Sequence, residues 1–158
     1  MRKQEASNLF KSGNNCAQSV LISFRDILNM DENQLRGIAA GFGGGMGKLQ
    51  LTCGAVTGAF MVFSMYSSMH TKDNASAKSM STELIRSFNE KYKAKTGSLS
   101  CRDILGVDMN SEEGQRVASE KNLFGTVCVD AVETAVEIAE EILKSVGSGQ
   151  SPVGSRNR

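Results

Sequence analysis

The sequence contains a single proline, Pro152, which lies close to the C-terminal end. The first 150 residues therefore lack the strongest helix breaker. They also lack a convincing alternation of apolar and polar residues, which would predict strands, and the best candidate is the short run 48–52. Helical spacing of apolar residues recurs along the chain and is clearest over 131–143. These patterns predict an all-α protein, a single-domain bundle of about six or seven helices.

An excess of charge of either sign is absent as well. Eighteen Lys and Arg against seventeen Asp and Glu give a net charge of +1, which argues against nucleic acid and anionic membrane surfaces as partners. The longest apolar-rich stretch, 55–66, is shorter than the roughly 20 residues that cross a bilayer. The polar N-terminus lacks the apolar run of a secretory signal. We therefore expect a cytoplasmic protein with no membrane insertion and no nucleic-acid partner.

The usual short cysteine motifs are missing. Cys16, Cys53, Cys101 and Cys128 are separated by 37, 48 and 27 positions, so no pair has the C-x-x-C spacing of structural zinc sites and thioredoxin-type sites. The absence of C-x-x-C-H argues against covalent c-type haem. His70 is the only histidine, so a Cys–His nucleophile scheme would have to use it. Its position near a predicted helix end favours a solvated side chain instead.

A chain of 158 residues has the size of one ordinary domain. We expect a helical four-cysteine domain over 1–146 and a disordered tail over 147–158, which is rich in Ser and Gly and poor in apolar residues. Polar residues that favour helix N-caps precede several helical patterns. These predicted caps are Asn14, Asp31, Asp73 and Asn110 or Ser111.

Each of the four cysteines follows a polar capping residue and opens a predicted helix. A helix N-terminus carries unsatisfied N–H groups and a partial positive charge, which can lower a thiol pKa from about 8.5 to about 3.5–7.5. We therefore predict that the four thiols converge and favour the thiolate form. They would act as redox thiols if the protein is cofactor-free, or as metal ligands. The alternative is that each cysteine is a small buried hydrophobe.

The segment 37–48 contains six glycines in twelve positions and precedes the predicted central helix. It does not match a phosphate-binding loop, because Leu49 follows Gly47-Lys48 where that motif needs Ser or Thr. It does not match a dinucleotide-binding loop either. We interpret the glycines as positions where the backbone approaches a site closely. The glycines expected around a cofactor or thiol site are Gly43, Gly44, Gly45 and Gly54.

The residues around the cysteines resemble a known family. C-G-A-V-T-G-A begins at Cys53, N-C-A-Q-S-V-L surrounds Cys16, and C-R-D-I-L-G begins at Cys101. With Cys128, this arrangement resembles the C_GCAxxG_C_C family of redox-active proteins over roughly residues 3–145. The resemblance implies a redox or metal-binding role. In a related domain attached to a multihaem cytochrome, the cysteines are associated with an iron–sulfur centre.

Our functional hypothesis is a redox protein in two versions. The cysteines cycle between dithiol and disulfide, for example Cys53 with Cys101, or all four hold an iron–sulfur cluster or another metal. Zinc would lack its usual short ligand spacing. The second hypothesis is a non-catalytic accessory module with structural or inert cysteines. The redox partner is unknown, and the small-residue face at Gly54 would serve a homodimer or an internal helix contact equally well.

Overall fold

The computed structural model describes residues 1–149, which form an all-α bundle, as the sequence predicts. An isolated bridge between Thr52 and Ser100 is the one sheet-type pairing recorded in this range. Nine α-helices form in it, more than predicted, because two are only four and five residues long. They are α1 (Arg2–Lys11), α2 (Cys16–Ser23), α3 (Arg25–Leu28), α4 (Glu32–Ala39), α5 (Gly54–His70), α6 (Asn74–Thr96), α7 (Cys101–Leu105), α8 (Glu112–Glu120) and α9 (Val129–Gly147).

The helix starts follow the capping residues of the sequence, with one difference. The side chains of Asp31, Asp73 and Ser111 accept hydrogen bonds from the first turns of α4, α6 and α8, as predicted. At α2 the cap is Asn15 and not Asn14. The Asn14 amide instead donates to a carbonyl of α1 and accepts from an arginine of α4. The first cysteine therefore follows its cap directly.

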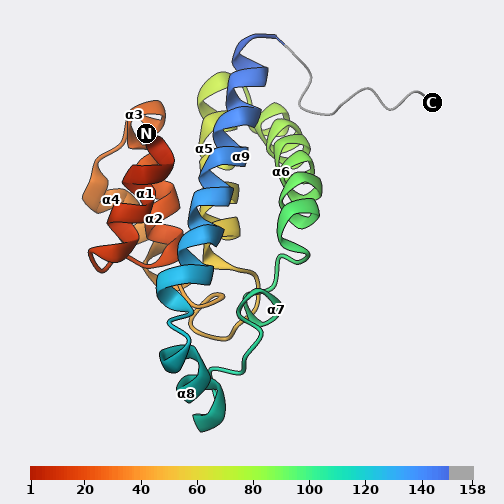
Figure 1. The fold of residues 1–158 in the computed structure, drawn as a ribbon. Coiled ribbons are helices and arrows are strands. Elements are labelled where there is room, and N and C mark those ends of the chain that lie inside the picture. The colour runs from red at the N-terminus through yellow and green to blue at the C-terminus, as the bar shows by residue number, and fades with distance from the viewer. Residues whose placement is uncertain (150–158) are drawn as a thin grey trace, which may run out of the picture.

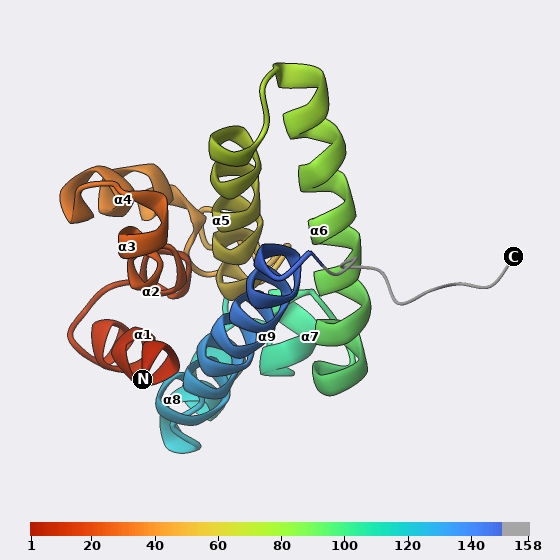
Figure 2. The ribbon, with the colours of Figure 1, turned by 90° about the horizontal axis from the view of Figure 1, so that it is seen from above.

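The hydrophobic core lies around α5, which packs against α2, α6 and α9. Helices α1 to α4 form one side of the molecule and α6 the other, with α5 and α9 between them (Figures 1 and 2). Phe88 of α6 contacts Phe63 and Tyr92 with ring centroids 5.7 Å and 5.2 Å apart. Such aromatic pairs each stabilise the core by about 0.5–1.5 kcal/mol beyond the area they bury.

The small-residue face of α5 lies inside the molecule. Ala55 and Ala59 are fully buried, and Gly58 lies so close to α2 that an added Cβ would be 2.8 Å from the Ala17 carbonyl oxygen. The close approach of two backbones is what small residues permit. Of the two uses that the sequence left open for this face, the structure shows the internal helix contact.

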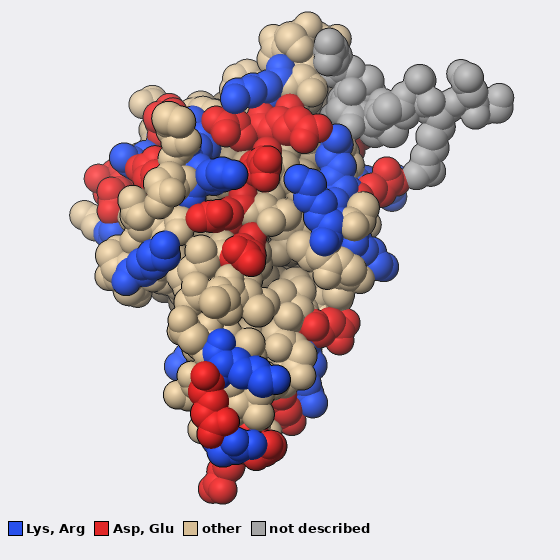
Figure 3. Space-filling view, viewed as in Figure 1, with Lys and Arg blue, Asp and Glu red and all other residues tan. Residues whose placement is uncertain are grey.

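The surface charges are unevenly distributed. Lys, Arg, Asp and Glu gather over the upper half of the face in Figure 3 and again on α8, and the band between them carries few charged side chains. Ion pairs such as Lys91–Glu141, at 2.7 Å, join α6 to α9 at the surface. Within residues 1–149, no helix is both long and apolar enough to cross a membrane. Of the predicted tail, 147–158, the first residue is the last of α9 and residues 150–158 lie outside the described range.

Candidate functional site

The Gly-rich loop, α7 and α8 lie toward one end of the bundle (Figure 1). Residues of these segments line a cavity of about 740 Å³. Cys16, Cys53, Cys101 and Cys128 all line it. Among the described residues, its lining includes no histidine, aspartate or glutamate. The structure therefore brings together the four side chains that the sequence singled out, although they come from four separate parts of the chain.

Two cysteines are held in place by paired backbone hydrogen bonds. The Cys53 N–H donates to the Leu99 carbonyl at 2.8 Å, and the Cys101 N–H donates to the Leu51 carbonyl at 2.7 Å. These bonds flank the isolated bridge and join the start of α5 to the start of α7. Cys53 and Cys101 are each only 7% exposed. The segments carrying these two cysteines are therefore joined directly through their backbones.

Cys16 and Cys128 are less buried, and only one of them begins a helix. Cys16 is the first residue of α2. Cys128 ends a π-helical turn, Phe124–Cys128, that runs directly into α9, and its N–H donates to the Leu123 carbonyl at 3.1 Å. The prediction that all four cysteines open helices is therefore wrong for Cys128, because its N–H bonds to a carbonyl of the helical turn that precedes α9. Single π-helical turns of this kind occur frequently at functional sites.

The Gly-rich loop turns back on itself through consecutive residues of positive φ. From Gly44 to Lys48 the φ angles are 63°, 74°, 62°, 60° and 61°. Met46, Lys48 and Gln50 adopt this left-handed region without being glycine, at a cost of roughly 1–2 kcal/mol each. Such outliers cluster at ligand-binding and active sites. The loop thus contains strain at the cavity edge.

The four predicted site glycines all lie at this cavity, in two different ways. Gly43 and Gly44 line it. Gly45 and Gly54 lie against cysteines, because a Cβ added to Gly45 would be 2.7 Å from the Cys101 Cβ and one added to Gly54 would overlap the Cys16 sulfur. No side chain fits in such spaces unless its neighbours shift.

A family model described as "Putative redox-active protein (C_GCAxxG_C_C)" matches residues 14–142, a range that includes all four cysteines and the Gly-rich loop. The chain belongs to this family. No curated protein and no solved structure matched the chain. The family resemblance predicted from the residues around the cysteines is thus confirmed.

Three thiols of this C_GCAxxG_C_C protein, those of Cys53, Cys101 and Cys128, have pKa values shifted in the direction opposite to the prediction. Burial, followed by negative charge on Cys16, raises the pKa of Cys53 to about 12, although N–H groups of the first turn of α5 act to lower it. Burial and the charge on Cys16 likewise raise the pKa of Cys101 to about 11 and that of Cys128 to about 12. The helix N-terminus effect is therefore present at Cys53, but desolvation outweighs it.

Charge on Cys16 acts on each of the other three cysteines. Cys16 is therefore close enough to the other three cysteines for its charge to raise their pKa values. The cysteines form no disulfide, and no group of three or more His, Cys, Asp or Glu within residues 1–149 is placed to hold a single metal ion.

Tyr92 is a site residue that sequence reasoning missed. It is fully buried, and a hydrogen bond links its hydroxyl to the Cys53 thiol. The hydroxyl also donates a long hydrogen bond of 3.5 Å to the Ala131 carbonyl. Burial, followed by negative charge on Cys53, raises the Tyr92 pKa. Its helical spacing indicated only a core position, and no sequence signal placed its hydroxyl beside a cysteine.

Gln50 is the second missed residue. Its side-chain oxygen accepts from the Met109 N–H at 2.8 Å, and its amide donates to the Val107 carbonyl at 3.0 Å. A further hydrogen bond from this side chain acts to lower the pKa of Cys101. Gln50 thus connects the Gly-rich loop to the segment after α7 and to one of the four thiols.

His70, and the two basic residues that lie near cysteines or the Gly-rich loop in the sequence, lie at or outside the edge of the cavity. His70 ends α5, where it stacks on Tyr66 at 3.9 Å between ring centroids, and it does not line the cavity. Arg102 forms an ion pair with Asp108 at 3.4 Å. Lys48 lines the cavity. Only Lys48 of these three is therefore in a position to act on a molecule in the cavity.

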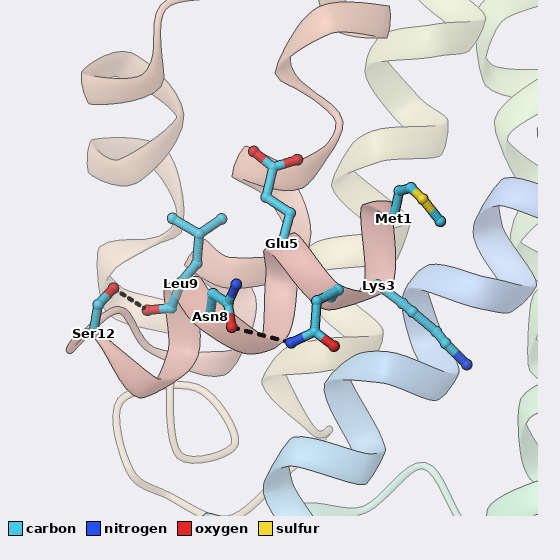
Figure 4. Close-up of a pocket in the computed structure, with 7 residues that line it drawn as sticks. Met1, Lys3, Glu5, Asn8, Leu9 and Ser12 are labelled. Carbon is cyan, nitrogen blue, oxygen red and sulfur yellow. Dashed lines mark hydrogen bonds between the residues drawn. The ribbon is translucent and has the colours of Figure 1, made fainter.

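A second, more open concavity follows the outer face of α1 (Figure 4). Its lining comes from residues 1–12 alone, and the side chains there bond to one another, as Gln4 does to Asn8 at 3.1 Å. It contains no cysteine. The cysteine cavity is therefore the candidate functional site.

We expect the Tyr92–Cys53 hydrogen bond to be measurable as a coupling energy. Tyr92→Phe should lower the free energy of unfolding by about 1 kcal/mol, and the loss should shrink when Cys53 is already alanine. Urea unfolding of the two single variants and the double variant tests this. Tyr66→Phe, in the core but away from the cavity, is the matched control. Strictly additive effects of the two substitutions would contradict the hydrogen bond.

Thiol titration should make the metal-free protein less stable in alkali. The unfolded chain releases the Cys53 proton near pH 8.5, whereas the folded protein retains it until about pH 12. The stabilising effect is therefore complete below about pH 8.5 and is lost as the pH rises toward 12. From pH 9 to 11 this thiol alone should lower the free energy of unfolding by about 2–3 kcal/mol. Urea unfolding across this range measures the loss, which should be smaller in Cys53→Ala; parallel curves would refute it.

Proposed function

We propose that the four cysteines of this C_GCAxxG_C_C protein form one redox centre, with an iron–sulfur cluster as its favoured form. The observation that carries the proposal is that all four line one cavity whose described lining offers no imidazole or carboxylate. A set of four thiols is a soft donor set and the usual ligand set of an iron–sulfur cluster. The proposal also agrees with the description of the family.

The donor set suits a cluster better than a single ion. A tetrahedral zinc needs sulfur atoms about 3.8 Å apart, given zinc–sulfur distances of about 2.3 Å, and no group of three ligands within residues 1–149 is placed to hold one ion. A cluster distributes its thiolates over more than one iron. Gly45 and Gly54 support this use, because they let the backbone approach Cys101 and Cys16 without a side chain between.

When bound, the cluster would supply one-electron transfer. The protein's own residues would ligate it, exclude water and tune it. Tyr92 and Gln50 hydrogen-bond to the thiols of Cys53 and Cys101, and hydrogen bonds to cysteine sulfur are among the factors that set a cluster's reduction potential.

The alternative version is a dithiol–disulfide cycle, and the pairing favoured by the structure is Cys53 with Cys101. The paired backbone bonds hold their segments together. The two thiols would pass two electrons and two protons to a substrate disulfide by way of a mixed disulfide. Burial works against this version, since a protonated thiol is a poor nucleophile. Either version suits a reducing compartment such as the cytoplasm, where thiols stay free.

Anaerobic purification of the full chain tests the proposal. We expect brown protein with visible absorption, stoichiometric iron and acid-labile sulfide, and four thiols that react only after the iron is removed. Iron-free protein that loses thiols in pairs under mild oxidation would replace the cluster with the disulfide cycle. Colourless, metal-free protein whose four thiols resist oxidation would overturn both versions in favour of an accessory module.

A further inference from the structure

We infer that the cavity beside the four cysteines binds a small organic anion with an apolar body. The inference rests on the proposed function in one respect, since it names the class of substrate that would reach the redox centre. Three features of the cavity support it: its size, its largely apolar walls and the positive charge at its edge.

The cavity is larger than the proposed redox centre requires. Its volume of about 740 Å³ corresponds to about 25 water molecules at about 30 Å³ each. It also lies within the range of about 300–1,000 Å³ that is typical of small-molecule sites. A cluster of four irons and four sulfides has only eight atoms, so space for an organic molecule remains beside it.

The walls of this space are largely apolar. Phe10 lines it from α1, Ile104 from α7, and Met109 and Phe124 from the segments on either side of α8. Phe124 is 46% exposed, so part of its ring is accessible to a molecule that enters the cavity. A ligand with a flat or branched hydrocarbon body would cover this surface and remove it from water.

The edge of the cavity favours negative charge. Lys48 is the one charged residue in the described lining, and within residues 1–149 it forms no ion pair with a carboxylate. Arg102, by contrast, is paired with Asp108. The stem of Lys48 lies over Gly44, with its Cγ 3.0 Å from where a Gly44 Cβ would be. The lysine is therefore directed along the loop that borders the cavity.

Backbone donors add to this positive edge. Within the described part of the chain, the N–H of Gly44, which lines the cavity, donates no hydrogen bond, although the N–H groups of residues 46–48 all do. The starts of α2 and α5, eight and seventeen residues long, also lie at the cavity, and helix N-termini attract anions. A carboxylate or sulfonate would meet these donors and Lys48, while a cation would find no carboxylate in the described lining.

The first test uses 8-anilinonaphthalene-1-sulfonate as an apolar anion and N-phenyl-1-naphthylamine as its neutral counterpart. Fluorescence titration of the full chain should show one anion site per chain. Lys48→Gln should weaken the anion about tenfold and leave the neutral probe unchanged. Lys121→Gln, which changes a lysine outside the cavity lining, is the matched control. Equal binding of the anion by both variants would overturn the charge assignment.

The second test uses a large side chain to fill the cavity. A Cβ added at Gly41 or Gly37 meets no atom within 4 Å, and neither residue has a left-handed backbone. Only Gly41 lines the cavity. Gly41→Phe should therefore weaken both probes at least tenfold, while Gly37→Phe should bind them normally. Unchanged binding in Gly41→Phe, or an equal loss in both variants, would overturn the inference.

Iron, sulfide and thiols are measured on the same samples, which separates the two proposals. Normal iron content with no probe site refutes the organic-anion inference and leaves the redox centre intact. A probe site that responds to Lys48→Gln and Gly41→Phe in a protein without redox-active thiols refutes the redox centre alone. Circular dichroism of each variant excludes binding of the probe to unfolded chains.

Discussion

Replacing Gly45 with alanine is expected to lower the free energy of unfolding by about 3 kcal/mol and to displace Cys101. The residue has a φ of 74°, where alanine costs about 1 kcal/mol. The new Cβ would also lie 2.6 Å from the Gln50 Cα and 2.7 Å from the Cys101 Cβ, and overpacking of this kind costs about 1–3 kcal/mol. Urea unfolding gives the energy, and the iron content reports the position of Cys101.

Gly47→Ala provides the matched control for this prediction. Gly47 lies two residues further along the same loop with a φ of 60°, but an added Cβ there meets no atom within 4 Å. The free energy of unfolding of Gly47→Ala should fall by only about 1 kcal/mol, which is the cost of placing alanine in this backbone conformation. It should keep a normal iron content. If both variants lose the same stability, contact with Cys101 is not what makes Gly45 necessary.

Cys16→Ser should reduce the iron content of the anaerobically purified protein at least tenfold. Cys16 is the cysteine whose charge reaches the other three, and loss of even a residue that supports a metal ligand costs about 10–100-fold in metal affinity. A serine hydroxyl is a hard, weakly acidic group and does not replace a thiolate on iron. Iron analysis and the visible spectrum measure the loss.

The control for Cys16→Ser is Met109→Leu. This substitution removes a different sulfur from the same cavity and conserves the side-chain volume closely. It should leave the iron and the spectrum unchanged. A Cys16→Ser protein that retains the wild-type iron content and spectrum would remove Cys16 from the proposed ligand set.

Much of the fold follows from local sequence signals. The lack of proline and the spacing of apolar residues predicted an all-α bundle, and Asp31, Asp73 and Ser111 cap the helices that they were expected to cap. The helix count was too low, and α3, with four residues, is too short to show a period of 3.6 residues. Asn14 and Asn15 are adjacent residues of the same type, so the sequence alone did not distinguish the cap.

The sequence predicted that the four cysteines lie together, but not the direction in which the pKa values of three of them are shifted. The four cysteines and the glycines around them were identified from their flanking residues. The pKa shifts of Cys53, Cys101 and Cys128 were predicted in the wrong direction, because a helix start is visible in the sequence and the degree of burial is not. Tyr92 was missed for a related reason: its hydroxyl reaches Cys53 from α6, a helix with no sequence signal of chemistry.

The left-handed turn of the Gly-rich loop was also beyond sequence reasoning. Positive φ angles are expected at Gly44, Gly45 and Gly47 because glycine adopts them readily. Met46 and Lys48 share the same backbone conformation without being glycine. Nothing in the residue types predicts that two ordinary side chains accept this cost. Contacts with the rest of the fold offset this conformational cost. They include the hydrogen bonds of the Gln50 side chain, which connect the loop to the segment after α7.

The spread of the cysteines along the chain has a consequence for biosynthesis. Cys16 and Cys128 are 112 positions apart, which takes about 6–22 s to translate at about 5–20 residues per second. Until α9 is made and docks against α1, α2 and α5, the cavity has no closed wall. A nascent chain therefore carries three of the four thiols before Cys128 is made, so a centre that uses all four can assemble only after residue 128 has been synthesised.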